Sequence, residues 1–140
     1  MIGVVLISHG KMADGMLDSC KLFFGEEIPQ ISSVCLLPKD SPEEFDKKIQ
    51  LAISEVDSGD GVLILCDLLG GTPCNRCAYL LNNRIQVIAG VNLSILLEFL
   101  ATRDSLKDIS ELDVEALIFV GTNGLVSLNK LLTLWFRNRY

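Results

Sequence analysis

The sequence predicts one α/β domain, in which helices cover a four-stranded parallel sheet with the strand order 2-1-3-4. Its length of 140 residues, of which 49% are hydrophobic and 21% charged, is sufficient for one buried core. Short apolar runs typical of strands buried on both faces alternate with segments of helical periodicity. Such strand–helix units in series form parallel sheets with right-handed crossovers, and no linker or internal repeat interrupts them.

The first two units extend to about residue 56. Residues 2–8 (IGVVLIS) form the first apolar strand, and residues 12–24 carry apolar side chains at helical spacing before a glycine ends the helix. Residues 31–37 form the second strand. The second helix begins at residues 41–44 (SPEE), which supply an N-cap serine, a proline for the first turn and the glutamate of a capping box.

The next two units follow the same order. Residues 61–67 (GVLILCD) are the third strand, after which Pro73 can open a helix that extends to residue 82 or 83. Residues 85–91 are the fourth strand. Asn92 is the expected N-cap of a fourth helix, whose leucines recur at helical spacing.

The C-terminal third has two interpretations. One is a helix, a turn at residues 121–124 and a short strand at Leu125–Asn129; the other is a hairpin, because turn residues lie between two apolar runs. We divide the chain into a domain at residues 1–130 and an apolar tail at residues 131–140. The tail contains the only tryptophan. We expect it to pack against the domain or a second subunit rather than a membrane, because apolar stripes are usually buried.

Composition excludes several classes of function. The formal net charge is -6 and no segment concentrates lysine or arginine, so nucleic acids and anionic membranes are not expected partners. Neither a signal peptide nor an apolar run near the roughly 20 residues of a membrane span is evident. The five cysteines are odd in number and lie mostly in apolar segments, which favours reduced thiols over a disulfide framework. We therefore expect a cytoplasmic protein without a metal or a cofactor.

A histidine and an aspartate follow two of the expected strands. His9, the only histidine, comes after the first strand, and Asp67 ends the third. In the order 2-1-3-4 these strands are neighbours, so both side chains should meet at the carboxyl end of the sheet, where the strand order reverses and ligands bind. A carboxylate that accepts one imidazole N–H fixes the tautomer, leaves the other nitrogen as a nucleophile and stabilises developing positive charge.

The loop after Asp67 adds a candidate anion site. Gly70, Gly71 and Thr72 precede a proline at a helix start, where free backbone N–H groups, the helix dipole and the Thr72 hydroxyl can bind a phosphate. Each feature alone has an ordinary explanation: a structural histidine, an aspartate that caps a turn, and a common loop. Together they suit phosphoryl transfer to a histidine.

Three motifs carry a resemblance to a known family. SHG after the first strand, CDLLGGTPCN after the third and VIAGVNLSILLEFL after the fourth resemble, in order and spacing, the enzyme IIA component of the mannose-family sugar phosphotransferase system. The resemblance covers roughly residues 1–130. It implies a cytoplasmic homodimer whose histidine accepts a phosphoryl group from the histidine-containing phosphocarrier protein and passes it to enzyme IIB. The group then reaches a sugar that enters through a membrane permease, with which the domain works only indirectly.

Carried onto this chain, the resemblance makes His9 the phosphorylated residue, Asp67 the carboxylate hydrogen-bonded to it, and Thr72 the hydroxyl residue ahead of the proline. It also implies a fifth, antiparallel strand exchanged between subunits, which corresponds to part of Leu125–Asn129. The chain differs from the family at Cys74, where an aromatic residue is frequent, and in its longer and more apolar tail.

Three other functions share some of these features. The phosphotransfer subunit of dihydroxyacetone kinases is similar in fold and has the early histidine but lacks the Gly-Gly-Thr-Pro loop, which favours the sugar system. A regulatory domain switched by phosphorylation of His9 would carry the same residues. Cys74-Asn75-Arg76-Cys77 is a C-x-x-C at a helix start, typical of thioredoxin-like dithiols. That interpretation leaves the alignment of His9 with Asp67 unexplained, and a zinc site there would lack ligands.

Overall fold

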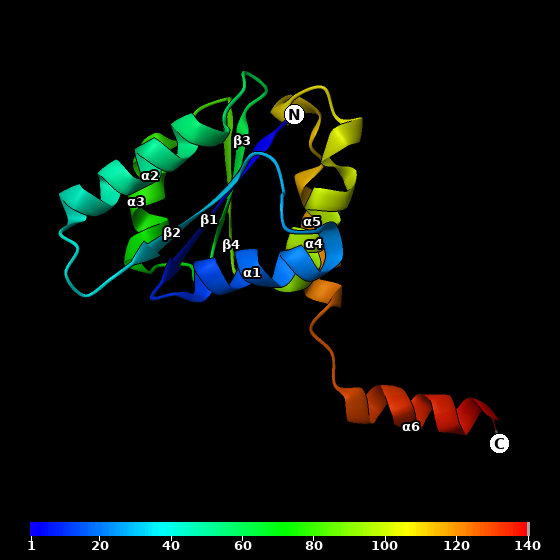
Figure 1. Ribbon diagram of the computed structural model, residues 1–140. Coiled ribbons are helices and arrows are strands. Elements are labelled where there is room, and N and C mark those ends of the chain that lie inside the picture. Colours follow the sequence, from blue (N-terminus) through cyan, green and yellow to red (C-terminus); the bar gives the residue numbers. More distant parts are fainter. Residues whose placement is uncertain (140) are drawn as a thin grey trace.

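The computed structural model describes residues 1–139 and contains a four-stranded parallel sheet (Figure 1). Its strands are β1 (Gly3–His9), β2 (Ile31–Leu36), β3 (Val62–Cys66) and β4 (Ile85–Ala89). They are arranged in the order β2-β1-β3-β4, so the predicted strand order is confirmed. Helical segments connect the strands, because parallel neighbours cannot be joined by a tight hairpin.

Helices cover both faces of the sheet (Figure 1). On one face lie α2 (Pro42–Val56) and α3 (Thr72–Cys77), and on the other lie α1 (Met12–Phe24), α4 (Leu93–Thr102) and α5 (Val114–Asn123). Short 3-10 turns lie at Ala78–Leu80, Arg103–Ser105 and Ile109–Glu111.

Local sequence signals set the starts of two helices as predicted. The Ser41 hydroxyl accepts a hydrogen bond from the Glu44 N–H (3.1 Å), while the Glu44 carboxylate accepts one from the Ser41 N–H (3.3 Å), which completes the capping box of α2. The Asn92 side chain caps α4 by accepting the Ile95 N–H (3.0 Å).

The third helix is shorter than predicted. α3 ends at Cys77, and the 3-10 turn at Ala78–Leu80 replaces the extension to residue 82 or 83. The side chain of Asn82 accepts a hydrogen bond from the Arg84 N–H (2.8 Å), which turns the chain into β4. An asparagine that bonds its own backbone two residues on favours a turn over a continuing helix.

The core is centred on the two middle strands. All five residues of β3 are buried, and so are the first six of the seven residues of β1. Phe45 of α2 and Phe99 of α4 are fully buried on opposite faces of the sheet. Each such side chain contributes about 1.5–3 kcal/mol through burial. The residues that follow β1 and β3 therefore start from two firmly held strands.

The C-terminal region differs from the prediction. Neither the hairpin nor a fifth strand at Leu125–Asn129 is present, because residues 125–127 have no regular structure and α6 (Leu128–Arg139) begins next. α6 extends away from the sheet (Figure 1), and its apolar side chains, including Trp135 and Phe136, are exposed. The backbone groups of a strand need a partner strand for their hydrogen bonds. Because the chain after α5 leads away from its own sheet, it has no such partner, and from residue 128 on it forms the hydrogen bonds of a helix instead. Within residues 1–139 no single helix is long and apolar enough to cross a membrane; only α5 and α6 taken together pass on length and composition, with a bend of 80° between them.

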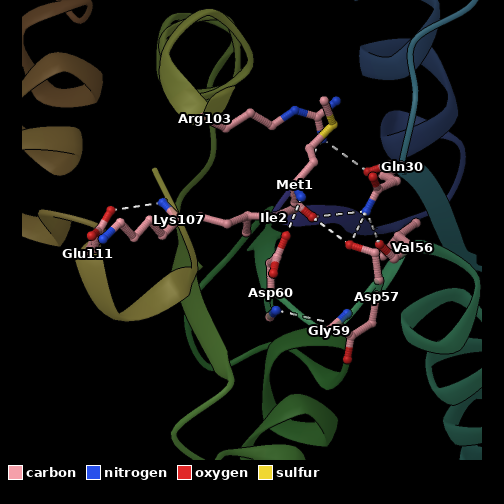
Figure 2. Close-up of polar contacts among 12 residues, drawn as sticks. Met1, Ile2, Gln30, Val56, Asp57, Gly59, Asp60, Arg103, Lys107 and Glu111 are labelled. Carbon is pink, nitrogen blue, oxygen red and sulfur yellow. Dashed lines mark hydrogen bonds and ion pairs between the residues drawn. The ribbon is translucent and has the colours of Figure 1, made fainter. Parts of the chain in front are cut away.

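A buried arginine fastens the amino end of the sheet. Arg103 is 2% exposed, and its guanidinium donates hydrogen bonds to the carbonyls of Ile2 (3.1 Å), Gln30 (3.2 Å) and Pro29 (2.5 Å). Figure 2 shows the surrounding network, in which the Gln30 side-chain amide also donates to the Met1 carbonyl (3.0 Å). Arg103 thus joins its own segment to the chain near Ile2 and to the chain at residues 29–30, which are distant in the sequence.

We predict that Arg103→Ala lowers the free energy of unfolding by about 3 kcal/mol, because three carbonyls lose a charged donor in a buried place. Urea unfolding followed by circular dichroism measures this loss. Arg84→Ala is the matched control, since Arg84 is half-exposed and pairs with Asp57 (2.9 Å) at the surface, and it should shift the midpoint far less. Equal shifts in the two variants would contradict the role assigned to Arg103.

Candidate active site

The predicted pair, His9 and Asp67, is in contact at the carboxyl end of the sheet. In the register of β1 and β3, Ile7 lies opposite Cys66. His9, the last residue of β1, and Asp67, the first residue after β3, therefore lie at the same end of two neighbouring strands. The Asp67 N–H donates to the Ile7 carbonyl (3.1 Å), which continues the pairing one residue beyond β3. The adjacency of His9 and Asp67 is therefore a direct consequence of the strand order.

One oxygen of Asp67 holds both the backbone and the ring of His9. Oδ2 accepts the His9 backbone N–H (2.9 Å) and lies 2.8 Å from the ring Nδ1. The proton on this contact belongs to Nδ1, since an ionised carboxylate only accepts. Nε2 is then left with its lone pair. The His9 side chain is 46% exposed and that of Asp67 is 10% exposed, so a half-exposed imidazole lies over a nearly buried carboxylate.

The two oxygens of Asp67 have different surroundings. Oδ1 is buried and accepts no hydrogen bond from any of residues 1–139. The hydrogen bonds that these residues donate to the carboxylate both come from His9, to Oδ2. This arrangement favours positive charge on the imidazole, which is the charge that forms when Nε2 attacks an electrophile.

The loop between β3 and α3 lies against the His9 ring. Gly70 has a φ of +81°, a left-handed conformation that favours glycine. Gly71 is the N-cap of α3, and a Cβ added to it would lie 2.5 Å from Cε1 and 3.1 Å from Nε2 of His9. Asn75 holds the loop in place, because its N–H donates to the Gly71 carbonyl (2.9 Å) and its side chain to that of Gly70 (3.2 Å). Only glycine allows this approach of the backbone to the ring.

The structure gives less support for Thr72 as part of the predicted anion site than for Gly70 and Gly71. It is the first residue of α3, and it lines an open groove of about 500 Å³ next to His9, together with Gly10, Leu36, Leu37, Pro38, Asp40 and Pro42. α3 has only six residues, so its dipole supports an anion less than the longer predicted helix would. The expected anion site thus depends on the backbone of the loop and on the Thr72 hydroxyl more than on the helix.

Ser8 is a functional residue that the sequence did not single out. It is 2% exposed, and its hydroxyl accepts the Ala13 N–H (2.7 Å) and donates to the Gly10 carbonyl (3.2 Å). Gly10 has a φ of +55°, and Lys11, the N-cap of α1, offers no side-chain cap. Ser8 therefore fixes the turn that follows His9. The sequence feature that could have indicated this role of Ser8 is a small hydroxyl residue at the end of an apolar strand, shortly before a helix.

The C-x-x-C cysteines lie on α3, and neither makes a hydrogen bond to His9 or Asp67. Cys77 is fully buried beside Cys66, and Cys74 is half-buried. Within residues 1–139 no three histidine, cysteine, aspartate or glutamate side chains converge as metal ligands.

The fold and the site together define a doubly wound domain with a histidine–aspartate pair at its topological switch point. Residues 3–117 match the family described as PTS system fructose IIA component. The chain therefore belongs to this family, the enzyme IIA components of the mannose and fructose branch of the sugar phosphotransferase system. Membership implies phosphoryl transfer in sugar uptake.

Individual relatives agree with this placement. The chain is 34% identical over 113 residues to the fructose-specific EIIA component of Bacillus subtilis, covering 78% of this chain and 77% of that protein. It is 30% identical over 129 residues to the mannose-specific EIIAB component of Escherichia coli, a match that takes in 91% of this chain but only 39% of that longer protein. The crystal structure of the EIIA component from Streptococcus agalactiae is similar with a TM-score of 0.82 at 28% identity, over 93% of this chain and 99% of that one.

We predict that Gly71→Ala displaces the His9 ring and weakens its contact with Asp67, because the new methyl group would overlap the imidazole. The ring nitrogens of the only histidine give unambiguous signals in long-range ¹H–¹⁵N spectra, which report the tautomer. Gly15→Ala is the matched control, since a Cβ at this position of α1 meets nothing within 4 Å. Unchanged imidazole signals in Gly71→Ala would contradict the close approach.

Proposed function

We propose that this protein is a phosphocarrier, which accepts a phosphoryl group on His9 from the histidine-containing phosphocarrier protein and passes it to enzyme IIB. One observation carries the proposal: the only imidazole of the chain has its Nδ1 on the Asp67 carboxylate, which leaves Nε2 free and half-exposed. The free cysteines of the described chain fit a reducing compartment, and we assign the exchange to the cytoplasm.

In the proposed reaction Nε2 of His9 attacks the phosphorus atom of the incoming phosphohistidine. The new N–P bond forms as the N–P bond to the donor breaks, and the donor imidazole keeps the electron pair of the broken bond. Positive charge then develops on the His9 ring, and Asp67 stabilises it through Nδ1–H. Transfer to enzyme IIB is the same step with His9 as the leaving group, so no cofactor is needed.

The β3–α3 loop is the proposed phosphate-binding element. Gly71 lies against the ring that would carry the phosphoryl group, and Gly70 gives the turn that brings it there. Thr72 lines the groove that also borders Gly10, the residue after His9. These groups can bind phosphoryl oxygens without adding a charged side chain, which suits a group that must leave again.

The surface around His9 is suited to a protein partner. Met12, Leu37, Leu68 and Leu69 follow the carboxyl ends of β1, β2 and β3, and all four are exposed. An exposed apolar rim of this kind marks an interaction site. We propose that both the donor and the acceptor protein dock here in turn, since each must reach the same nitrogen.

We predict that phosphoenolpyruvate, its kinase and the phosphocarrier protein convert this protein to an acid-labile, base-stable phosphoprotein, and that His9→Ala takes up no label. Asp67→Asn should slow the transfer by roughly two to four orders of magnitude, because an amide neither fixes the tautomer nor stabilises the charge. Rapid-quench measurement of the phosphoprotein checks both.

Asp18→Asn is the control for the loss of one carboxylate, since Asp18 is exposed on α1 and far from the site in the fold. It should transfer at the normal rate. Label in His9→Ala would sink the assignment, because no other histidine exists. Normal kinetics in Asp67→Asn would remove Asp67 from the mechanism.

We also propose that the protein is a homodimer in which the segment 125–139 of one copy packs on the other. The edge strand β4 and α5 border an apolar pocket of about 360 Å³, lined by Ile88, Ile118 and Leu125 among others. α6 carries a matching stripe of uncovered apolar side chains: Leu128, Leu131, Leu132, Trp135 and Phe136. Residues 125–127 have no regular structure and are available to pair with β4 of the second copy.

We predict that the full chain sediments as a dimer at micromolar concentration, and that truncation after Gly124 gives monomers or aggregates. Truncation at this point preserves α5, whose Gly121 carbonyl accepts the Asn92 side chain (2.7 Å). Leu132→Asp should weaken the dimer, whereas Thr133→Asp, on the polar face of α6, should not. A monomeric full chain would refute the proposal, and a dimer that survives truncation would place the interface elsewhere.

A further inference from the structure

Three of the five cysteines gather under the loop that contacts His9. Cys66 is the last residue of β3 and Cys77 the last of α3; both are fully buried, and their Sγ atoms are 3.8 Å apart. Cys74 lies one turn earlier on α3 and packs, half-buried, against the same cluster. Phosphoryl transfer at His9 uses none of these thiols.

We propose that Cys66 and Cys77 are a reversible modification site, which a peroxide oxidises to a disulfide. The two sulfur atoms are already in contact, and a disulfide requires about 2.05 Å between them. The two residues come from different elements, so the bond would tie the end of β3 to the end of α3. In a reducing cell such bonds are transient and serve as redox sensors.

The two thiols are chemically unequal. The hydrogen bond from Cys66 lowers the pKa of the Cys77 thiol below its ordinary value. The same contact, together with burial, raises the pKa of Cys66. The Cys77 Sγ also lies 3.2 Å from the Pro73 carbonyl, to which its thiol donates, so this bond must break before the thiolate forms. With that bond broken, Cys77 supplies the thiolate and Cys66 is the resolving thiol. Both thiols are fully buried, so the oxidation requires a local opening of the β3–α3 segment and an oxidant as small as hydrogen peroxide.

The reaction balances with one peroxide. The Cys77 thiolate attacks one oxygen of hydrogen peroxide and the O–O bond breaks, which gives a sulfenic acid and a hydroxide that takes up a proton. The sulfur of Cys66 then attacks the sulfenic sulfur, the S–S bond forms, and the S–O bond breaks. The leaving hydroxide takes the proton of Cys66. Two thiols and one peroxide thus yield one disulfide and two waters.

This bond would act on the histidine site through both of its ends. Cys66 immediately precedes Asp67, whose carboxylate holds the ring, and Cys77 ends the helix whose N-cap, Gly71, lies against that ring. Drawing the sulfur atoms from 3.8 Å to bonding distance would constrain both of these neighbours, and we propose that it displaces at least one of them. Since a displacement near 1 Å can cost about 100-fold in rate, oxidation should slow phosphoryl transfer. This consequence rests on the proposed function, whereas the disulfide does not.

The disulfide is tested on the full chain by treatment with hydrogen peroxide, alkylation of free thiols and digestion with trypsin. Cleavage after Lys48, Arg76 and Arg84 separates the peptide 49–76, which holds Cys66 and Cys74, from the peptide 77–84, which holds Cys77. We expect these peptides to be linked, with fragmentation that assigns the bond to Cys66. Cys66→Ala and Cys77→Ala should each lose it, while Cys35→Ala, altered outside the cluster, should keep it.

Phosphoryl transfer is then measured for the reduced, oxidised and dithiothreitol-treated protein. We expect oxidation to slow transfer by about tenfold or more, reduction to restore it, and Cys77→Ala to be insensitive to peroxide. A bond from Cys77 to Cys74, or a Cys66 that stays fully alkylated, would overturn the site. A Cys66–Cys77 disulfide with unchanged transfer would overturn its effect on His9. A reduced protein that takes up no phosphoryl group would instead count against the proposed function and leave the disulfide intact.

Discussion

The site depends on one carboxylate oxygen that serves two groups of the same residue. Oδ2 of Asp67 accepts both the backbone N–H and the ring Nδ1 of His9, so the end of β1 and the imidazole are fixed by a single contact. This contact exists only because β1 and β3 are neighbours in the sheet. It sets the tautomer, directs Nε2 outward and places compensating charge where positive charge develops. The chemistry proposed for His9 thus depends on the strand order.

The two ends of the sheet are built from different elements: a hydrogen-bonded network at the amino end and glycine-rich turns at the carboxyl end. At the amino end, Arg103 and Gln30 satisfy carbonyls from several segments, and the network is largely buried. At the carboxyl end, turns made possible by Gly10, Gly70 and Gly71 lie around an exposed imidazole. The first arrangement holds the scaffold together. The second keeps side chains away from the ring, which is the space that the proposed phosphoryl group and partner protein would need.

The site is separated from the buried cysteines by only a few residues, which is why oxidation of these thiols could affect it. Asp67 follows Cys66 directly, and Gly71 begins the short helix that Cys77 ends. The buried thiols are therefore connected to the histidine through a few rigid residues on each side. In contrast, α6 is separated from the domain by residues 125–127, and its apolar side chains are exposed. Changes in the tail should affect assembly before they affect the ring.

The sequence by itself determined the elements that depend on local signals. Apolar runs specified the four strands, residues 41–44 specified the start of α2, and Asn92 specified the cap of α4, because each pattern acts within a few residues. The family motifs and the position of His9 and Asp67 at strand ends indicated the candidate pair from the sequence alone.

Only the tertiary structure decided features that need contacts between distant segments. The place of Gly71 on the His9 ring, the bonds of Ser8 and Arg103, and the contact of Cys66 with Cys77 depend on packing that no local pattern encodes. Residues 125–129 form no strand within the single chain for the same reason: their composition is strand-like, but a strand forms only where a partner edge satisfies its backbone. The exchange of this strand between subunits stays a prediction.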